Sequence, residues 1–219
     1  MGTSFASKRL DELLLQSQNR QQETRFACVR FGNVMDSRGS VIPLFQNQIA
    51  TGGPITLTDP EVKRYFMTIP EAVQLVIQAG LLNGENGSIY VLDMGNPVRI
   101  ADMARDLVEL AGLRVGQDIQ IKTIGLRPGE KMSEELVGEG EAIVPTEHPR
   151  IFLVNNTVRP QPEEMERLLA RLWEASQSDE PKEIYAVLED FKVLIRREGK
   201  PSRLSAPALV ASKVKRAPR

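Results

Sequence analysis

The 219-residue sequence predicts an α/β fold, and three observations support that prediction. Short apolar runs alternate along the chain with longer segments in which apolar residues recur at helical spacing. The short runs are typical of buried strands, and the longer periodic segments are typical of amphipathic helices. Glycine and proline separate many of these segments, as at positions 52–54. An alternation of strands and helices favours a sheet that is covered by helices.

The individual elements follow from these patterns in chain order. Apolar periodicity predicts helices over 5–17, 41–50, 100–111, 162–176 and 182–197, and a further helix that Pro70 opens. Apolar runs predict strands over 26–31, 55–58, 89–92, 119–123 and 151–154. A cluster of turn-forming residues predicts a turn over 36–39.

Two of the helices have apolar faces that the sequence defines residue by residue. In the helix opened by Pro70, proline suits the first turn and the following glutamate complements the helix dipole. Its apolar face is predicted to contain Ala72, Val73, Val76 and Ile77. The helix over 100–111 ends before Gly112. Its residues in register are Ile100, Met103, Ala104, Leu107, Leu110 and Ala111.

Composition excludes several classes of protein. The chain has 28 Lys and Arg against 29 Asp and Glu, so its balanced charge gives no reason to expect a nucleic-acid partner. Cys28 is the single cysteine, which excludes a disulfide framework and favours a reducing cytoplasm. No apolar run approaches the roughly 20 residues that span a bilayer. The sequence therefore predicts a cytoplasmic protein without nucleic acid.

Polar residues follow or precede the apolar runs in three separate segments. Arg30 and Asn33 come at the end of the first strand, Arg64 precedes the helix of Pro70, and Arg127 follows the strand over 119–123. The guanidinium group is a planar fork that matches phosphate oxygens. Each segment taken alone also fits an ordinary turn or a solvated surface arginine. Together the three segments favour an anionic ligand such as a pyrophosphate.

These segments resemble one known family in their order and approximate spacing. The similarity runs from about Ala6 to about Val154. It is to the polysaccharide-biosynthesis (CapD-like) family of UDP-N-acetylglucosamine 4,6-dehydratases and their relatives, in the extended short-chain dehydrogenase class. The matching runs are Val29-Arg30-Phe31-Gly32-Asn33-Val34, Ser37-Arg38-Gly39-Ser40-Val41-Ile42-Pro43-Leu44-Phe45, Arg64-Tyr65-Phe66-Met67-Thr68-Ile69-Pro70-Glu71-Ala72, Leu92-Asp93-Met94-Gly95 and Leu126-Arg127-Pro128-Gly129-Glu130-Lys131.

The resemblance implies a Rossmann-type part that binds NAD or NADP and a smaller C-terminal part that grips a UDP-sugar. In this class, hydride leaves sugar C4 for the cofactor, water is lost across C5 and C6, and the hydride returns to C6. Carried over by motif, Asn33 would contact the UDP-sugar, and Arg64 and Arg127 would hold its diphosphate or nucleotide end. Glu130 would support the same loop, and Arg30 belongs to the same predicted substrate-binding set.

Lys8 is the one residue that the resemblance assigns to catalysis and to the cofactor. The wider class places a Tyr-x-x-x-Lys motif on a helix, and the long membrane-bound members of the family carry Met in place of Tyr. Here Ser4 stands four positions before Lys8. A solvated helix lysine is an alternative interpretation. The Gly-x-x-Gly-x-x-Gly turn that approaches the cofactor pyrophosphate is not found in the sequence. We therefore expect a partial Rossmann-like fold that lacks its N-terminal cofactor-binding half and does not bind NAD or NADP alone.

The resulting division of the chain is a substrate-binding part over 5–155, a helical extension over 156–199 and a basic, disordered tail over 200–219. The expected partners are a UDP-sugar and either a second copy or the missing N-terminal half. Because the long family members carry transmembrane helices, the resemblance also implies that a parent protein could lie at the cytoplasmic face of the inner membrane. Two alternatives stay open: a non-catalytic remnant that serves in binding or oligomerisation, and a nucleotide-sugar C4 epimerase. No metal site is expected, and His148 is interpreted as a loop residue.

Overall fold

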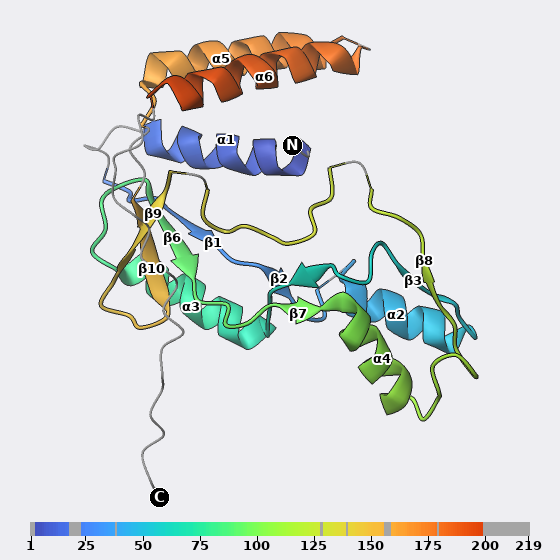
Figure 1. The fold of residues 1–219 in the computed structure, drawn as a ribbon. Helices are drawn as coiled ribbons and strands as arrows, with labels where there is room; N and C mark the ends of the chain where they lie inside the picture. Colours follow the sequence, from blue (N-terminus) through green and yellow to red (C-terminus); the bar gives the residue numbers. More distant parts are fainter. Residues whose placement is uncertain are drawn as a thin grey trace, which may run out of the picture.

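A four-stranded sheet forms the centre of the computed structural model, which describes residues 3–17, 23–37, 39–127, 129–138, 140–155, 159–178 and 180–198. The strand order is β1-β6-β10-β9, in which β1 and β6 are parallel and the other two pairs are antiparallel. Figure 1 shows α1 on one face of this sheet and α3 on the other. The bounds are β1 (Ala27–Arg30), β6 (Ser88–Leu92), β9 (Ala142–Pro145), β10 (Ile151–Asn155), α1 (Thr3–Ser17) and α3 (Ile69–Leu81).

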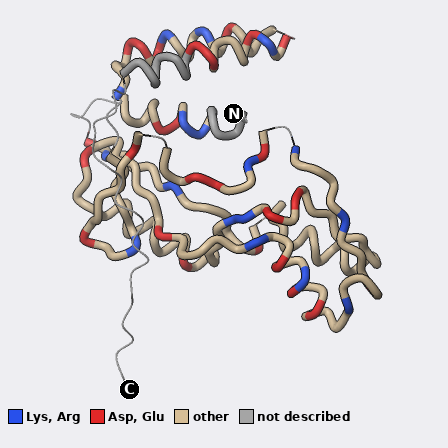
Figure 2. Tube along the Cα trace, viewed as in Figure 1, with Lys and Arg blue, Asp and Glu red and all other residues tan. Residues whose placement is uncertain are grey.

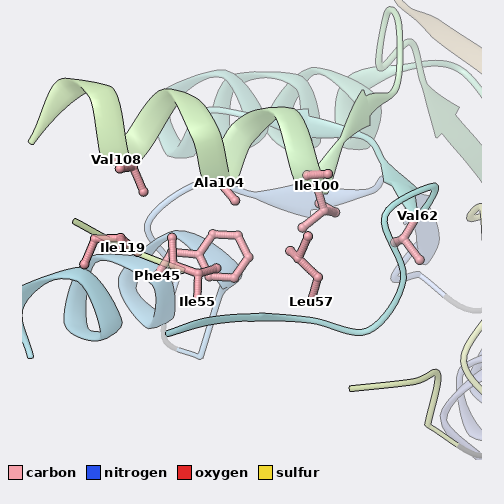
Figure 3. Close-up of a cluster of buried hydrophobic side chains, with 9 residues drawn as sticks. Phe45, Ile55, Leu57, Val62, Ile100, Ala104, Val108 and Ile119 are labelled. Carbon is pink, nitrogen blue, oxygen red and sulfur yellow. The ribbon is translucent and has the colours of Figure 1, made fainter. Parts of the chain in front are cut away.

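A second lobe is built on a small parallel pair of strands, β3 (Ile55–Leu57) and β8 (Ile121–Thr123). Two helices pack beside this pair, α2 (Val41–Ala50) and α4 (Ile100–Leu110). Their facing side chains are apolar and fully enclosed, so this lobe has a core of its own (Figure 3). That core contains Phe45, Ile55, Leu57, Val62, Ile100, Ala101, Ala104, Val108 and Ile119.

Two pairs of very short strands connect the central sheet to the second lobe. The parallel pair consists of β2 (Asn33–Val34) and β5 (Phe66–Met67), and the antiparallel pair of β4 (Lys63–Arg64) and β7 (Val98–Arg99). Asn33 and Arg64, two of the polar residues that the sequence analysis selected, thus fall at the junction of the two lobes.

A helical layer covers α1 on the side away from the sheet. It consists of α5 (Pro162–Ser176) and α6 (Pro181–Glu198), which run side by side above α1 in Figure 1. Leu13 of α1 is buried against Met165 and Leu168 of α5, so the three helices share a small core. Among the described residues, no helix is long and apolar enough to cross a membrane.

The predicted helices and strands are confirmed, with shifts of one or two residues at most ends. The strands β2, β4, β5, β7 and β9 were not predicted. Four of these are two residues long and therefore carry no periodic signal, and β9 is a mostly exposed edge strand. The predicted tail over 200–219 lies outside the described residues, and the division into domains stays a prediction.

The predicted apolar face of α3 is not the face that is buried, apart from Ala72. The helix begins with a capping box, in which the Thr68 side chain accepts from the Glu71 N–H and Glu71 accepts from the Thr68 N–H. The structure buries Ala72, Leu75 and Ala79 against the sheet. In contrast, Val73, Val76 and Ile77 are 51%, 38% and 61% exposed. The prediction failed because α3 is apolar on both sides, so periodicity alone could not choose the buried one.

The predicted register of α4 needs a similar correction at its end. Ile100 and Ala104 are buried as expected, but Val108 takes the buried place in the last turn and Leu110 is 83% exposed. The helix ends at Leu110, and Gly112 follows with φ +73°, a backbone conformation that glycine adopts at little cost.

Candidate functional site

Three segments that are far apart in the sequence meet at the junction of the two lobes. Asn33 on β2 donates from Nδ2 to both carboxylate oxygens of Glu134, each at 3.4 Å. Arg64 on β4 lies with Nε 3.6 Å from Glu134 and donates from Nη2 to Glu130 at 3.3 Å. Two carboxylates of the loop that follows β8 therefore lie against an amide and a guanidinium group from two short strands.

Backbone hydrogen bonds hold this loop beside β4. The Lys63 N–H donates to the carbonyl of Met132 at 2.9 Å. The Arg64 Nη1 group donates to the carbonyl oxygens of Lys63 and Met132 at 2.8 and 3.2 Å. The arginine side chain is mostly buried, and these contacts fix its direction.

Glu130 is anchored from two further directions. It accepts at Oε1 from the Thr58 hydroxyl at 3.0 Å and at Oε2 from the Arg127 backbone N–H at 3.2 Å. Arg127 is exposed on the same loop. Glu130 thereby ties Arg127 to Arg64 and places two cationic side chains on one loop and its neighbouring strand.

The close approach of β2 and β5 depends on Gly32. A Cβ atom at this position would lie 2.8 Å from the Tyr65 Cβ and 3.0 Å from the Tyr65 carbonyl oxygen. The next residue, Asn33, donates its backbone N–H to that same carbonyl at 2.9 Å. Glycine therefore allows the backbone contact that sets Asn33 in place.

Arg30 has a different environment from Arg64. Its Nε and Nη2 donate to Glu12 at 2.6 and 2.7 Å, and its Nη1 and Nη2 donate to Glu141 at 2.5 and 3.0 Å. The remaining N–H, on Nη1, donates to the Leu136 carbonyl at 3.0 Å. A guanidinium group has five N–H donors, so every one of them has a protein acceptor. Arg30 joins α1, β1 and the segment before β9 and offers no N–H to a ligand in this arrangement.

The surroundings of Arg30 shift the pKa values of its neighbours. Burial would lower the pKa of Arg30, but the hydrogen bonds to Glu12 and Glu141 outweigh it and raise the pKa. Burial would raise the pKa of Glu141, yet Arg30 and the Gly138 N–H hold it below its usual value. Burial, reinforced by the Glu12 charge, raises the pKa of the Cys28 thiol to about 11.

Lys8 is exposed on α1 and lies outside the junction cluster. That cluster consists of Asn33, Thr58, Arg64, Arg127, Glu130 and Glu134. Within the described part of the chain, no hydrogen bond or ion pair joins Lys8 to Asn33, Arg64 or Glu130. A nicotinamide cofactor also needs a glycine-rich turn at a helix N-terminus to receive its pyrophosphate, and the sequence has none. The described residues therefore do not by themselves fit NAD or NADP, and the role of Lys8 stays a prediction.

Other candidate chemistry is weak. His148 accepts at Nδ1 from the Arg150 N–H at 3.1 Å inside the turn before β10. Within the described ranges, no group of three or more His, Cys, Asp or Glu side chains could hold a metal ion. Figure 2 shows basic and acidic positions mixed over sheet, helices and loops, as expected for a formal charge of −1.

Two residues of the junction cluster were not predicted, Glu134 and Thr58. Glu134 follows the Arg127–Lys131 motif by three residues, and a second acid so close to a predicted anion-binding loop was a usable signal. Thr58 was not distinguishable from any polar residue that ends a strand. Only the fold brings it to Glu130, which is 72 positions away.

Comparison with known proteins agrees with this architecture. Residues 1–156 match the family described as "Polysaccharide biosynthesis protein". The chain is 56% identical over 137 residues to the capsular polysaccharide biosynthesis protein CapD of Staphylococcus aureus, covering 62% of this chain and 22% of that protein. It is 49% identical over 148 residues to the probable polysaccharide biosynthesis protein EpsC of Bacillus subtilis, covering 68% and 24%.

A solved structure and an epimerase are also similar. The structure of Pen from Bacillus thuringiensis superposes with a TM-score of 0.59 at 39% identity, covering 72% of this chain and 46% of that one. A UDP-glucose 4-epimerase of Rickettsia akari is 42% identical over 117 residues, covering 53% of this chain and 33% of the enzyme.

The fold and these similarities define the class, which is that of the extended short-chain dehydrogenases with a Rossmann-like α/β fold. The chain belongs to the polysaccharide biosynthesis protein family. It spans 22% and 24% of the length of its relatives CapD and EpsC.

Proposed function

We propose that this chain is the UDP-sugar-binding part of a nucleotide-sugar 4,6-dehydratase that acts in polysaccharide biosynthesis. The observation that carries the proposal is the convergence of Asn33, Arg64 and the Arg127–Glu130 loop at one junction. These segments are up to about a hundred positions apart in the sequence, and nothing in their local structure requires them to meet.

The chemistry of the junction suits a nucleoside diphosphate. Arg64 and Arg127 provide two positive charges beside the carboxylates of Glu130 and Glu134, and a guanidinium fork can bind two phosphate oxygens at once. Asn33 adds a neutral donor and acceptor for a sugar or ribose hydroxyl. The anchoring of Glu130 by Thr58 keeps the loop that carries Arg127 in a fixed position, which lowers the entropy lost on binding.

The proposal revises the predicted role of one residue. Arg30 was predicted to bind substrate, but its five N–H groups all donate to protein acceptors. We assign Arg30 a structural role, in which it joins α1 to β1 and to the segment that carries Glu141.

The proposed catalytic half would cover the surface that this chain leaves bare. β1 is an edge strand in which three apolar residues precede Arg30, and its residues are only half-buried or exposed. In contrast, all five residues of β6 are buried. The outer face of α3 beside it is also apolar, with Val73 and Ile77 exposed. A parallel strand added to β1 and a helix laid on α3 would bury both surfaces. The family resemblance supports a cofactor-binding half as the source of those elements.

Calorimetric titration with UDP-N-acetylglucosamine tests the proposal directly. We expect weak but saturable binding by the chain and no binding of NAD or NADP. The variant Arg64→Met should weaken the binding at least tenfold, because a charge-assisted contact to phosphate is lost. Arg105→Met is the matched control, because Arg105 pairs with the exposed Asp102 within α4, outside the junction. Equal effects of the two variants, or no binding at all, would leave the alternative of a non-catalytic remnant.

The similarity to a UDP-glucose 4-epimerase supports a second candidate function, C4 epimerisation. The two reactions give different products, since a dehydratase forms a 4-keto-6-deoxy sugar and an epimerase inverts C4. We therefore suggest a chimera in which the part of the Staphylococcus aureus relative that precedes the matched segment is joined ahead of this chain. Product analysis by NMR with UDP-N-acetylglucosamine then separates the functions, and we expect the 4-keto-6-deoxy product.

A further inference from the structure

Glu134 is held more loosely than Glu130 and Glu141. Its oxygens lie 3.4 Å from the Asn33 Nδ2 and 3.6 Å from the Arg64 Nε. Charge-assisted hydrogen bonds are ordinarily about 2.7–2.9 Å long. In comparison, Glu141 lies 2.5 Å from Arg30, and Glu130 has two further donors at 3.0 and 3.2 Å. Glu134 thus lies between Asn33 and Arg64, two residues predicted to bind the substrate, without a short hydrogen bond to either.

The donors of Arg64 are divided in the same way. Both Nη1 donors are used by the carbonyl oxygens of Lys63 and Met132. The Nε and Nη2 atoms lie nearest the carboxylates, 3.6 Å from Glu134 and 3.3 Å from Glu130. Nε and Nη2 form the side of the guanidinium group that binds a carboxylate or a phosphate through two oxygens. This side of Arg64 faces the Glu130 and Glu134 carboxylates at distances longer than those of a strong charge-assisted hydrogen bond.

We propose that Glu134 is a displaceable counter-ion of the substrate-binding site. Its carboxylate takes up the N–H groups of Arg64 and Asn33 while the site is free, and it releases them to phosphate oxygens when the diphosphate binds. The inference rests on the proposed function, because it assigns the diphosphate to this junction. Glu134 then opposes binding of the anion it resembles, and it keeps the affinity of the site low enough for the nucleotide to exchange.

The charge balance of the junction gives the direction of the effect. Arg64 faces both Glu130 and Glu134, so one cation is shared between two anions before any ligand arrives. Lys131 on the same loop is paired with Glu135 at 2.8 Å. A diphosphate entering this site meets the charge of Glu134 at a few ångströms. Removal of the Glu134 charge should therefore tighten diphosphate binding roughly three- to tenfold at low salt.

The test compares Glu134→Gln with Glu135→Gln in the chain. Both substitutions are isosteric and remove one negative charge from the same loop, but Glu135 is exposed and bound to Lys131. UDP and inorganic pyrophosphate are titrated calorimetrically against wild type and both variants at low and at physiological salt. We expect Glu134→Gln to bind both anions three- to tenfold more tightly than wild type, and Glu135→Gln to stay within twofold of it. The Glu134 side chain is 34% exposed, so its variant is expected to fold, which circular dichroism checks.

The two ligands separate failure of the inference from failure of the proposed function. If wild type binds pyrophosphate but not UDP, the proposed function fails, and the pyrophosphate comparison alone decides the role of Glu134. Unchanged or weaker anion binding by Glu134→Gln relative to Glu135→Gln overturns the inference, since the carboxylate would then position its neighbours. Absence of binding of either anion by all three proteins overturns it as well.

Discussion

Replacement of Arg30 by methionine tests the structural role that its contacts define. The side chains of Arg30, Glu12 and Glu141 are 16%, 13% and 10% exposed, so the cluster is screened from water. Methionine keeps much of the apolar length of the side chain and removes all five N–H donors. Two carboxylates in the interior then lose their main partner.

The expected cost follows from burial. Breaking a buried ion pair by removing one partner costs about 3–5 kcal/mol, because the other charge stays uncompensated. Arg9 remains 2.7 Å from Glu12 and 3.6 Å from Glu141 and can compensate in part. We therefore expect the lower end of this range, about 3 kcal/mol at pH 7. Arg30→Lys keeps one charge without the planar fork and should lose about half as much.

The same variant should show a characteristic pH dependence. The folded-state pKa of Glu141 is lowered, so the cluster stabilises the native state above the ordinary carboxylate pKa of about 4.3. That stability is lost as the pH falls through the lowered pKa of Glu141. The difference between wild type and Arg30→Met should consequently be full at pH 7 and shrink below about pH 4.3.

Urea denaturation followed by circular dichroism measures both effects. The matched control is Arg171→Met, because Arg171 pairs with Asp190 at 2.6 Å on the surface, where both side chains are at least half exposed. Exposed pairs contribute about 0–1 kcal/mol, so this variant should unfold nearly as wild type does. A loss below 1 kcal/mol in Arg30→Met, or a loss that does not change between pH 7 and pH 3.5, would refute the assigned role.

Three further predictions concern the backbone, the thiol and the bare apolar surface. Gly32→Ala should lower the free energy of unfolding by about 1–3 kcal/mol in urea denaturation, because the added Cβ would lie 2.8 Å from the Tyr65 Cβ. Gly80→Ala in α3 is the control, since its added Cβ meets nothing within 4 Å, and it should be neutral or stabilising. Cys28 should react with a thiol reagent at pH 8 roughly 100-fold more slowly in the native protein than in urea, because its raised pKa leaves little thiolate; equal rates would contradict the burial of the thiol. Ile77→Glu should reduce binding of a hydrophobic dye and leave the unfolding midpoint nearly unchanged, since Ile77 is 61% exposed, whereas Leu75→Glu should unfold the chain.

The sequence predicted the elements of this fold well and the faces of some of them poorly. Helices such as α4 and strands such as β6 were found because their periodicity or apolar run extends over a turn or more. The buried face of α3 was missed because both of its sides are apolar, so the choice depends on what packs there. The two-residue strands were missed because they exist only through pairing with a distant partner.

The candidate site divides in the same way. Order and spacing of the motifs were enough to select Asn33, Arg64, Arg127 and Glu130, and the fold brings these residues to one junction. The sequence could not distinguish Arg30 from Arg64, since both are arginines beside a strand and an aromatic residue. The difference lies in their acceptors, which come from residues up to 111 positions away.

By itself, then, the sequence determined the α/β class, the polysaccharide biosynthesis family and the loops that carry the candidate substrate-binding residues. These properties depend on local periodicity and on residue order, which are written along the chain. Only the tertiary structure decided that Arg30 donates all its N–H groups to Glu12, Glu141 and the Leu136 carbonyl. It also decided that Arg64 retains donors beside the loosely held Glu134. Which acceptors take up the N–H groups of a side chain, and how deeply the side chain is buried, depend on contacts between distant segments, and no local sequence pattern specifies them.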